Sequence, residues 1–287
     1  MAEREVWTIG RILQWTEQYF KEKGIDSPRL DAEVLLAHLL GKERIHLYVH
    51  FDEPLEAGEL ASYRELVKKR VQHVPVAYLT GQREFMGLPF HVASGVLIPR
   101  PDTEILVQTA IELLRAMSGE TRFADIGTGS GAIALSVLHY VPGAFSEATD
   151  ISKDALAIAE KNAASLGLSE RVSFHEGDLL QPLGNSQYHA ILSNPPYIPD
   201  GDLPGLPPEV QEQEPRLALA GGSDGLDFYR RLAADAPARL LEGGFLAVEV
   251  GIHQAESVRC MTEEHGLRDA EIRRDLAGID RVVVAWK

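Results

Sequence analysis

The sequence is poor in cysteine, in basic residues and in long apolar runs, and each shortage excludes a class of protein. The single cysteine, Cys260, allows neither an internal disulfide nor a cysteine-based zinc site, which favours a reducing compartment. Lys and Arg number 28 against 43 Asp and Glu, and the resulting net charge of −15 disfavours binding to nucleic-acid backbones or anionic membranes. No stretch approaches the roughly 18 apolar residues of a membrane helix, and no apolar signal segment follows the charged residues 1–5. We therefore expect a cytoplasmic globular protein with no membrane partner and no direct nucleic-acid partner.

Hydrophobic periodicity divides the chain into three regions. Residues 1–75 show apolar spacings of three and four residues, which predict a small helical domain. Residues 76–100 change to short apolar segments separated by glycine, which predict a β-hairpin linker. Residues 101–287 alternate strand and helix patterns, and no helix separates the last two strand patterns. This order predicts an α/β domain, with a mostly parallel sheet, helices on both faces and an antiparallel edge strand.

A glycine-rich loop follows the first strand predicted in the third region. Gly127, Gly129 and Gly131 alternate with Thr128 and Ser130 where the strand passes into a helix. Glycine lets the backbone turn tightly and lets a ligand approach the main chain. Open α/β sheets bind their ligands at this carboxyl end of the strands. The loop therefore predicts a nucleoside-cofactor site, with a dinucleotide site and an ordinary βα turn as the alternatives.

Three acidic residues stand at or near the ends of successive predicted strands. Asp125 precedes the glycine loop, where a carboxylate would face a cationic amino group. Asp150 is placed to accept hydrogen bonds from ribose hydroxyls, and Asp178, followed by Leu179, to accept one from an adenine amine. Each acid alone is also compatible with a helix N-cap. Together they suit a ligand of net positive charge, and we predict S-adenosyl-L-methionine, with S-adenosyl-L-homocysteine as the product.

The tetrapeptide Asn194-Pro195-Pro196-Tyr197 follows the fourth predicted strand. Its prolines stiffen the loop and carry no N–H, so the loop presents acceptors, chiefly the Asn194 side-chain oxygen and the Pro195 carbonyl. Such acceptors fit a planar –NH2 group and can aim its nitrogen at a methyl carbon. We predict that Asn194 and Pro195 are catalytic, that all four residues bind substrate, and that Asn194 also contacts the cofactor. A turn that merely ends a strand is the alternative, and no metal site is predicted.

With these motifs the sequence resembles class I S-adenosylmethionine-dependent methyltransferases, and within them the HemK/PrmC family of release factor glutamine methyltransferases. The segment 98–104, Ile-Pro-Arg-Pro-Asp-Thr-Glu, points most specifically to this family. The other matching segments are the helical N-terminus and residues 75–81, 84–85, 96–97, 194–198, 213–222, 275–278 and 280–281. The resemblance therefore covers essentially the whole chain.

The resemblance implies an activity and its partners. The family transfers a methyl group to the N5 amide nitrogen of the glutamine in the Gly-Gly-Gln motif of peptide chain release factors. It implies a Rossmann-like seven-stranded methyltransferase domain at 101–287 and an N-terminal domain at 1–75 that docks the release factor. By position, the glycine loop and Asp150 would bind cofactor, and Asn194 with Pro195 would hold the glutamine amide. Arg100 and Glu104 would lie beside the site.

Two other functions stay open at the level of sequence. The same Asn194–Tyr197 motif would hold adenine N6 in nucleic acid, although the acidic charge counts against that substrate. A non-catalytic adenosine-binding module that binds a partner through its helices is the third possibility. Many relatives carry an aromatic residue where Leu179 stands, so the sequence leaves open which side chain stacks on the adenine.

Overall fold

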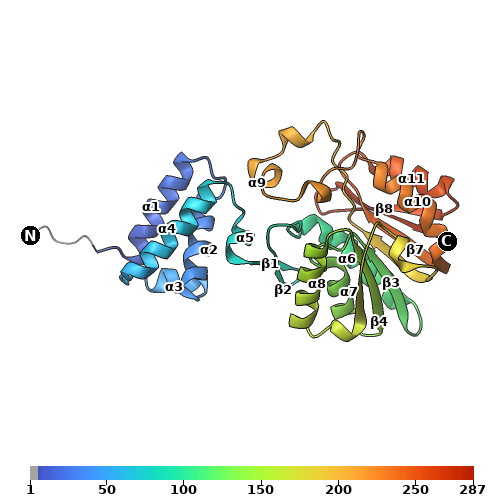
Figure 1. The fold of residues 1–287 in the computed structure, drawn as a ribbon, viewed down its shortest axis with the longest axis horizontal. Coiled ribbons are helices and arrows are strands. Elements are labelled where there is room, and N and C mark those ends of the chain that lie inside the picture. Colours follow the sequence, from blue (N-terminus) through green and yellow to red (C-terminus); the bar gives the residue numbers. More distant parts are fainter. Residues whose placement is uncertain (1–5) are drawn as a thin grey trace, which may run out of the picture. The chain divides into compact units, whose positions relative to one another are not determined.

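The computed structural model describes residues 6–287. The charged stretch 1–5, which also begins the helical domain expected at 1–75, lies outside the described residues. The chain forms two compact units (Figure 1). Unit 1 comprises Met1–Gly81, as far as it is described, with Pro208–Gln213, and unit 2 comprises Gln82–Pro207 with Glu214–Lys287. Among the described residues, no helix combines the length and apolar character needed to cross a membrane.

Unit 1 is built from helices. They are α1 (Ile9–Glu22), α2 (Pro28–Leu40), α3 (Arg44–Val49), α4 (Ala57–Val71), α5 (Val76–Thr80) and the short α9 (Pro208–Gln211). Thr8 caps α1 by accepting a hydrogen bond from the Arg11 N–H at 3.3 Å, and Gly41 ends α2 with a left-handed φ of +62°. Apolar side chains of α1, α2 and α4 then pack into one core, which includes Phe20, Leu35 and Tyr63.

A buried ion pair joins α2 to α4 in this unit. Arg70 Nε donates to Asp31 Oδ2 at 2.7 Å, and the two residues are only 6% and 8% exposed. The same guanidinium pairs with Glu209 at 2.9 Å, which ties α9 to α4. Removing one partner of such a pair leaves an uncompensated charge in an apolar surrounding.

Unit 2 contains a seven-stranded sheet and a separate hairpin of β1 (Gln82–Phe85) and β2 (Leu88–His91). The sheet has the order β5-β4-β3-β6-β7-β9-β8. Its strands are β3 (Thr121–Ile126), β4 (Ala144–Asp150), β5 (Val172–Glu176), β6 (Tyr188–Ser193), β7 (Leu240–Glu249), β8 (Arg268–Arg274) and β9 (Asp280–Trp286). The pairs among β3, β4, β5, β6 and β7 are parallel, whereas β9 runs antiparallel to both β7 and the edge strand β8. The mostly parallel sheet predicted from the sequence is confirmed.

Helices cover both faces of this sheet (Figure 1). One core cluster contains α6 (Glu104–Ala116), α7 (Ala132–Tyr140) and α8 (Lys153–Ser165), and the other contains α10 (Asp227–Arg239) and α11 (Ala255–Glu264). Central strands alternate between the clusters: Phe123 of β3 belongs to the first and Ala124 to the second. This alternation places the central strands between two layers of helices.

The hairpin differs in extent from its prediction. Residues 76–80, expected to be part of a β-hairpin linker, form helix α5, and the hairpin covers only β1 and β2. Pro75 precedes α5, and Gly81 ends it with a left-handed φ of +71°. The hairpin itself inserts Phe85, Leu88 and Phe90 into the core of unit 2. It is therefore a packed part of that unit.

We expect the substitution Arg70→Met to destabilise unit 1 by about 3 kcal/mol, because it leaves the buried Asp31 carboxylate without its partner. The measurement is urea unfolding followed by tryptophan fluorescence in a Trp286→Phe background. In that background the signal comes only from Trp7 and Trp15 of unit 1.

The matched control is Lys68→Met on the same helix. Lys68 pairs with Glu65 at 2.6 Å, but the two side chains are 59% and 63% exposed, so its loss is expected to cost at most about 0.5 kcal/mol. Equal effects of the two substitutions would contradict the role given to the buried pair.

Candidate active site

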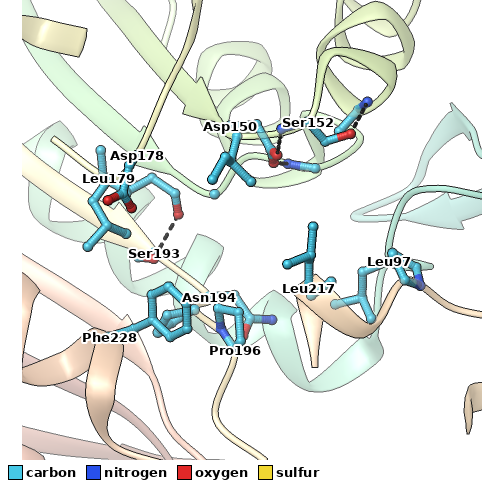
Figure 2. A pocket seen from close by; sticks show the side chains of 18 of the residues that line it. Leu97, Asp150, Ser152, Asp178, Leu179, Ser193, Asn194, Pro196, Leu217 and Phe228 are labelled. Carbon is cyan, nitrogen blue, oxygen red and sulfur yellow. Dashed lines mark hydrogen bonds between the residues drawn. The ribbon is translucent and has the colours of Figure 1, made fainter. Parts of the chain in front are cut away.

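A cavity of about 380 Å³ opens at the carboxyl ends of β3, β4, β5 and β6, within unit 2 (Figure 2). A volume of this size is in the range of small-molecule sites. Of the residues predicted for the site, those that line it are Gly127, Gly129, Asp150, Asp178, Leu179, Asn194, Pro195 and Pro196. The sequence did not predict the other lining residues, namely residues 95–97, Ile126, residues 151–152, Ala155, Gly177, Ser193, Pro215, residues 217–218, Phe228 and Arg231.

Asp150 holds the glycine loop against the end of β4. Its Oδ2 accepts from the Gly129 N–H at 2.8 Å, and its Oδ1 accepts from the Ser152 N–H at 2.9 Å. Each carboxylate oxygen has a further lone pair, so the side chain retains acceptors for a ligand. Gly127 and Gly129 adopt φ values of +72° and +56°, which other residues rarely tolerate. The loop therefore keeps a side-chain-free backbone at the cavity.

Asp125 does not lie where it was expected. It is fully buried, and its Oδ2 accepts from the Thr128 hydroxyl at 2.6 Å and from the Ala134 N–H at 3.1 Å. Burial raises the pKa of Asp125 to about 6, against the lowering effect of these two hydrogen bonds. Asp125 is not one of the described residues that line the cavity. Through these two hydrogen bonds, Asp125 holds the glycine loop and the first turn of α7.

Three further predicted residues also lie outside the described cavity lining. Thr128 and Ser130 are buried, at 5% and 3% exposure, within the loop. Gly131 ends the loop with φ +80°, and a Cβ at this position would meet Leu135 at 3.0 Å and Ala159 at 3.3 Å. These residues shape the loop rather than present groups to the cavity.

The start of α10 forms one wall of the cavity, which was not predicted from the sequence. Phe228 and Arg231 are three residues apart on this helix, and both line the cavity. Arg231 pairs with Asp178, whose neighbour Leu179 also lines it. Figure 2 shows Phe228, Asp178 and Leu179 around one end of the cavity. Phe228 thus provides an aromatic face near the residues expected to meet adenine.

The Asn194 side chain is held by a residue from another segment. Its Nδ2 donates to the Thr103 Oγ1 at 3.1 Å, a bond between residues 91 positions apart in sequence. Thr103 is 5% exposed and immediately precedes α6. Because the amide nitrogen donates to Thr103, the amide oxygen of Asn194 is left to accept from a ligand.

Segment 219–225 clamps the loop that follows β6. The Ile198 N–H donates to the Leu219 carbonyl at 3.0 Å, and the Gly221 N–H donates to the Ile198 carbonyl at 2.8 Å. A Cβ on Gly221 would come within 2.8 Å of the Pro196 carbonyl oxygen. Only glycine fits this approach, so the turn around residues 220–222 supports the loop directly.

Tyr197 contributes a backbone contact that holds the same loop. Its carbonyl accepts from Gln254 Nε2 at 2.9 Å. Burial, with a smaller effect of the Glu249 charge, raises the pKa of Tyr197 to about 12, which keeps the phenol neutral. Tyr197 is not among the described residues that line the cavity, so the structure does not present its ring as the predicted substrate wall.

Arg100 and Glu104 both hold neighbouring segments. Arg100 donates to the buried Glu214 at 2.5 Å, which anchors the segment that brings Pro215 to the cavity. Glu104 accepts from the Met86 N–H at 2.9 Å, which fixes the β1–β2 turn. Neither belongs to the described cavity lining.

Two histidines, His46 and His50, lie four residues apart at α3. In unit 1, ligand atoms of His46, His50 and Glu53 lie within 4.8 Å of one another. His50 Nδ1 lies 3.2 Å from a Glu53 carboxylate oxygen, and the rings of His46 and His50 stack with their centroids 4.0 Å apart.

Two family models match the chain. The PrmC N-terminal domain matches residues 11–81, and the methyltransferase small domain matches residues 102–203. A release factor glutamine methyltransferase of Geobacter sulfurreducens is 48% identical, over 99% of this chain and 98% of its own length. Another, from Moorella thermoacetica, is 45% identical over 92% and 93%. A solved methyltransferase structure from Pyrococcus furiosus has a TM-score of 0.52 at 16% identity, covering 70% of this chain and 89% of its own, and shows a shared fold alone.

We expect Phe228→Ala to weaken the binding of S-adenosylhomocysteine roughly 5- to 150-fold, because stacking of a base on an aromatic ring contributes about 1–3 kcal/mol. Isothermal titration calorimetry measures this dissociation constant. The matched control is Phe145→Ala, which removes a ring that is 38% exposed and outside the described cavity lining. The stacking role would be contradicted if Phe228→Ala changed the dissociation constant of S-adenosylhomocysteine by less than two-fold.

Proposed function

The chain belongs to the family of release factor glutamine methyltransferases, and we propose that it methylates the Gly-Gly-Gln glutamine of peptide chain release factors on N5, with S-adenosylmethionine as methyl donor. The observation that carries the proposal is the orientation of Asn194. Its Nδ2 donates to Thr103, so its oxygen is available to a substrate –NH2 group beside the cavity. Because release factors act with ribosomes, we place the activity in the cytoplasm.

The residues of the cavity fit the proposed cofactor. Gly127 and Gly129 keep the loop free of side chains, Asp150 retains acceptors for ribose hydroxyls, and Phe228 offers a face for the adenine ring. The Asp178 carboxylate, although paired with Arg231, keeps a second oxygen for the adenine amine. When bound, S-adenosylmethionine would supply an activated methyl group. The sulfonium sulfur is the leaving group and keeps the electron pair of the carbon–sulfur bond.

The protein's part in the chemistry is to orient a weak nucleophile. A carboxamide nitrogen has its lone pair delocalised into the carbonyl, so it attacks slowly in water. Acceptors on the Asn194 side chain and the Pro195 backbone hold its two hydrogens, aim the nitrogen and stabilise the positive charge that develops there. The nitrogen loses one proton to water once the N–C bond has formed. This path requires neither a covalent nucleophile nor a strong general base.

Unit 1 supports the proposed docking role through an exposed apolar surface on α3. Ile45, Tyr48 and Val49 are 64%, 53% and 71% exposed, although all three carry large apolar side chains. Contiguous exposed apolar residues mark interaction surfaces. We assign the release factor, outside its Gly-Gly-Gln loop, as the occupant of this surface.

Mass spectrometry of a release factor incubated with the protein and S-adenosylmethionine tests the activity. We expect one added methyl on the motif glutamine, and none on a release factor with Ala at that position. Asn194→Asp is expected to lower kcat roughly 100- to 1000-fold, because a carboxylate disturbs the charge beside the reacting centre. The dissociation constant of the cofactor should stay within about three-fold, since adenosine is held by other groups.

The same substitution at Asn185, an exposed residue of the loop before β6, is the matched control and should leave kcat unchanged. Undiminished turnover by Asn194→Asp would remove the assigned role. Labelling of DNA, and not of the release factor, in a mixture of both would overturn the substrate assignment in favour of a base amine.

The docking surface has its own test. The double substitution Ile45→Ser with Val49→Ser is expected to raise KM for an intact release factor roughly ten-fold or more, by removing buried apolar contacts. KM for a short Gly-Gly-Gln peptide should not change, because the peptide lacks the docking surface. Leu30→Ser, at a residue of α2 that is 44% exposed, is the control. An equal rise in KM for both substrates would contradict docking through α3.

A further inference from the structure

Glu249 is a buried acid beside Asn194 that the mechanism above does not use. Ser193 pairs with Val248 in the parallel β6–β7 register, so Asn194 and Glu249 follow at adjacent strand ends. Glu249 is 2% exposed, and its backbone carbonyl accepts from the Tyr229 hydroxyl at 2.8 Å, which fixes the end of β7. An ionisable side chain at such a position needs an explanation.

Both partners of the Asn194–Thr103 bond act on the pKa of Glu249. Thr103 and Asn194 each lower the pKa of its carboxyl group and so favour the ionised form. Its Oε2 is buried and has no hydrogen-bond partner among residues 6–287. Burial nevertheless dominates and raises the pKa of Glu249 to about 7.

The donor inventory of a carboxamide shows what this carboxylate does. The amide nitrogen of Asn194 carries two hydrogens, and its oxygen carries none. One hydrogen is donated to Thr103 at 3.1 Å, and the carboxyl group of Glu249 attracts the same –NH2 end. An ionised carboxylate only accepts, so it repels the amide oxygen and disfavours the flipped amide.

We propose that Glu249 is a positioning residue for the methyl transfer assigned above, whose carboxylate holds Asn194 with its oxygen directed to the substrate. The inference rests on the proposed function. Once protonated, Glu249 carries an O–H donor that is able to bind the Asn194 oxygen, and the substrate amide then loses its acceptor. The ionised form is therefore the active one.

The pH dependence follows from the groups around Glu249. Asp102 before α6 raises its pKa, and Arg281 of β9 lowers it. Arg281 is itself paired with Asp102 at 2.9 Å and with Asp275 at 2.8 Å, which limits its effect on Glu249. Tyr197 and Tyr229 face the same acid and stay neutral, because their pKa values are raised. Since the raised pKa favours the protonated form below about pH 7, activity should rise as the pH increases through that value.

The test is Glu249→Gln, which keeps the size of the side chain and removes its charge. We expect kcat on the release factor at pH 8 to fall roughly 10- to 100-fold, the cost of misorienting a substrate-binding group. KM for the release factor and the dissociation constant of the cofactor should each stay within two-fold. The rise of kcat/KM through pH 7 should disappear in Glu249→Gln and persist in Glu249→Asp, which keeps the charge.

The matched control is Glu147→Gln, the same change on β4, where the acid accepts from the Tyr188 hydroxyl at 2.6 Å. It should leave kcat and the pH profile unchanged. An active protein whose pH profile is the same in Glu249→Gln would overturn the positioning role. Absence of methylation by the unsubstituted protein would instead overturn the proposed function.

A measurement without turnover keeps the two failures apart. The side-chain amide signals of Asn194 in 15N-labelled protein are assigned by their loss in Asn194→Asp. We expect them to shift with a midpoint near pH 7 in the unsubstituted protein and to be independent of pH between 6 and 8 in Glu249→Gln. Signals that titrate identically in both proteins would refute the inference whether or not the enzyme is active.

Discussion

The hydrogen bond from Asn194 to Thr103 is the interaction on which the candidate site depends. The two ends of a carboxamide have nearly the same shape but opposite hydrogen-bonding character. A half-turn of the Asn194 side chain would replace an acceptor by two donors and would repel a substrate –NH2 group. Neither the strand that precedes Asn194 nor the prolines after it anchor the amide. Thr103, 91 positions earlier, accepts from its nitrogen.

Thr103 belongs to a segment, 100–104, whose side chains reach in four directions. Arg100 pairs with Glu214, Asp102 with Arg281, Thr103 with Asn194, and Glu104 with the Met86 N–H of the hairpin turn; the respective distances are 2.5, 2.9, 3.1 and 2.9 Å. The segment that resembled the family most specifically thus contacts three other matching segments, through Glu214, Arg281 and Asn194. Its specificity reflects these simultaneous contacts, none of which is visible as periodicity.

Hydrophobic periodicity predicted the helices and strands. The positions of single site residues depend on how those elements pack in three dimensions. Strands and helices of unit 2 were predictable because apolar spacing changes between two and about 3.6 residues. The position of Asp125 outside the cavity lining was not predictable, because the face of a strand end is not fixed by the sequence of that end. Asp125 alternates with Ala124 and so shares the face of Phe123, which packs with α7, and there it meets the Ala134 N–H. Phe228 was missed because nothing in its local sequence shows that its helix begins beside Leu179.

These placements also change the electrostatic interpretation of the site. Three carboxylates were expected around a cationic ligand, but Asp125 is buried away from the cavity lining with its pKa raised to about 6, and Asp178 is paired with Arg231. Asp150 is the acid of this set that lines the cavity without a cationic partner among the described ion pairs. A sulfonium loses its charge as the methyl group leaves, so a strongly anionic site would stabilise the reactant more than the transition state and slow the reaction. Neutral acceptors that follow the charge onto the substrate nitrogen, such as the Asn194 oxygen and the Pro195 carbonyl, avoid that cost.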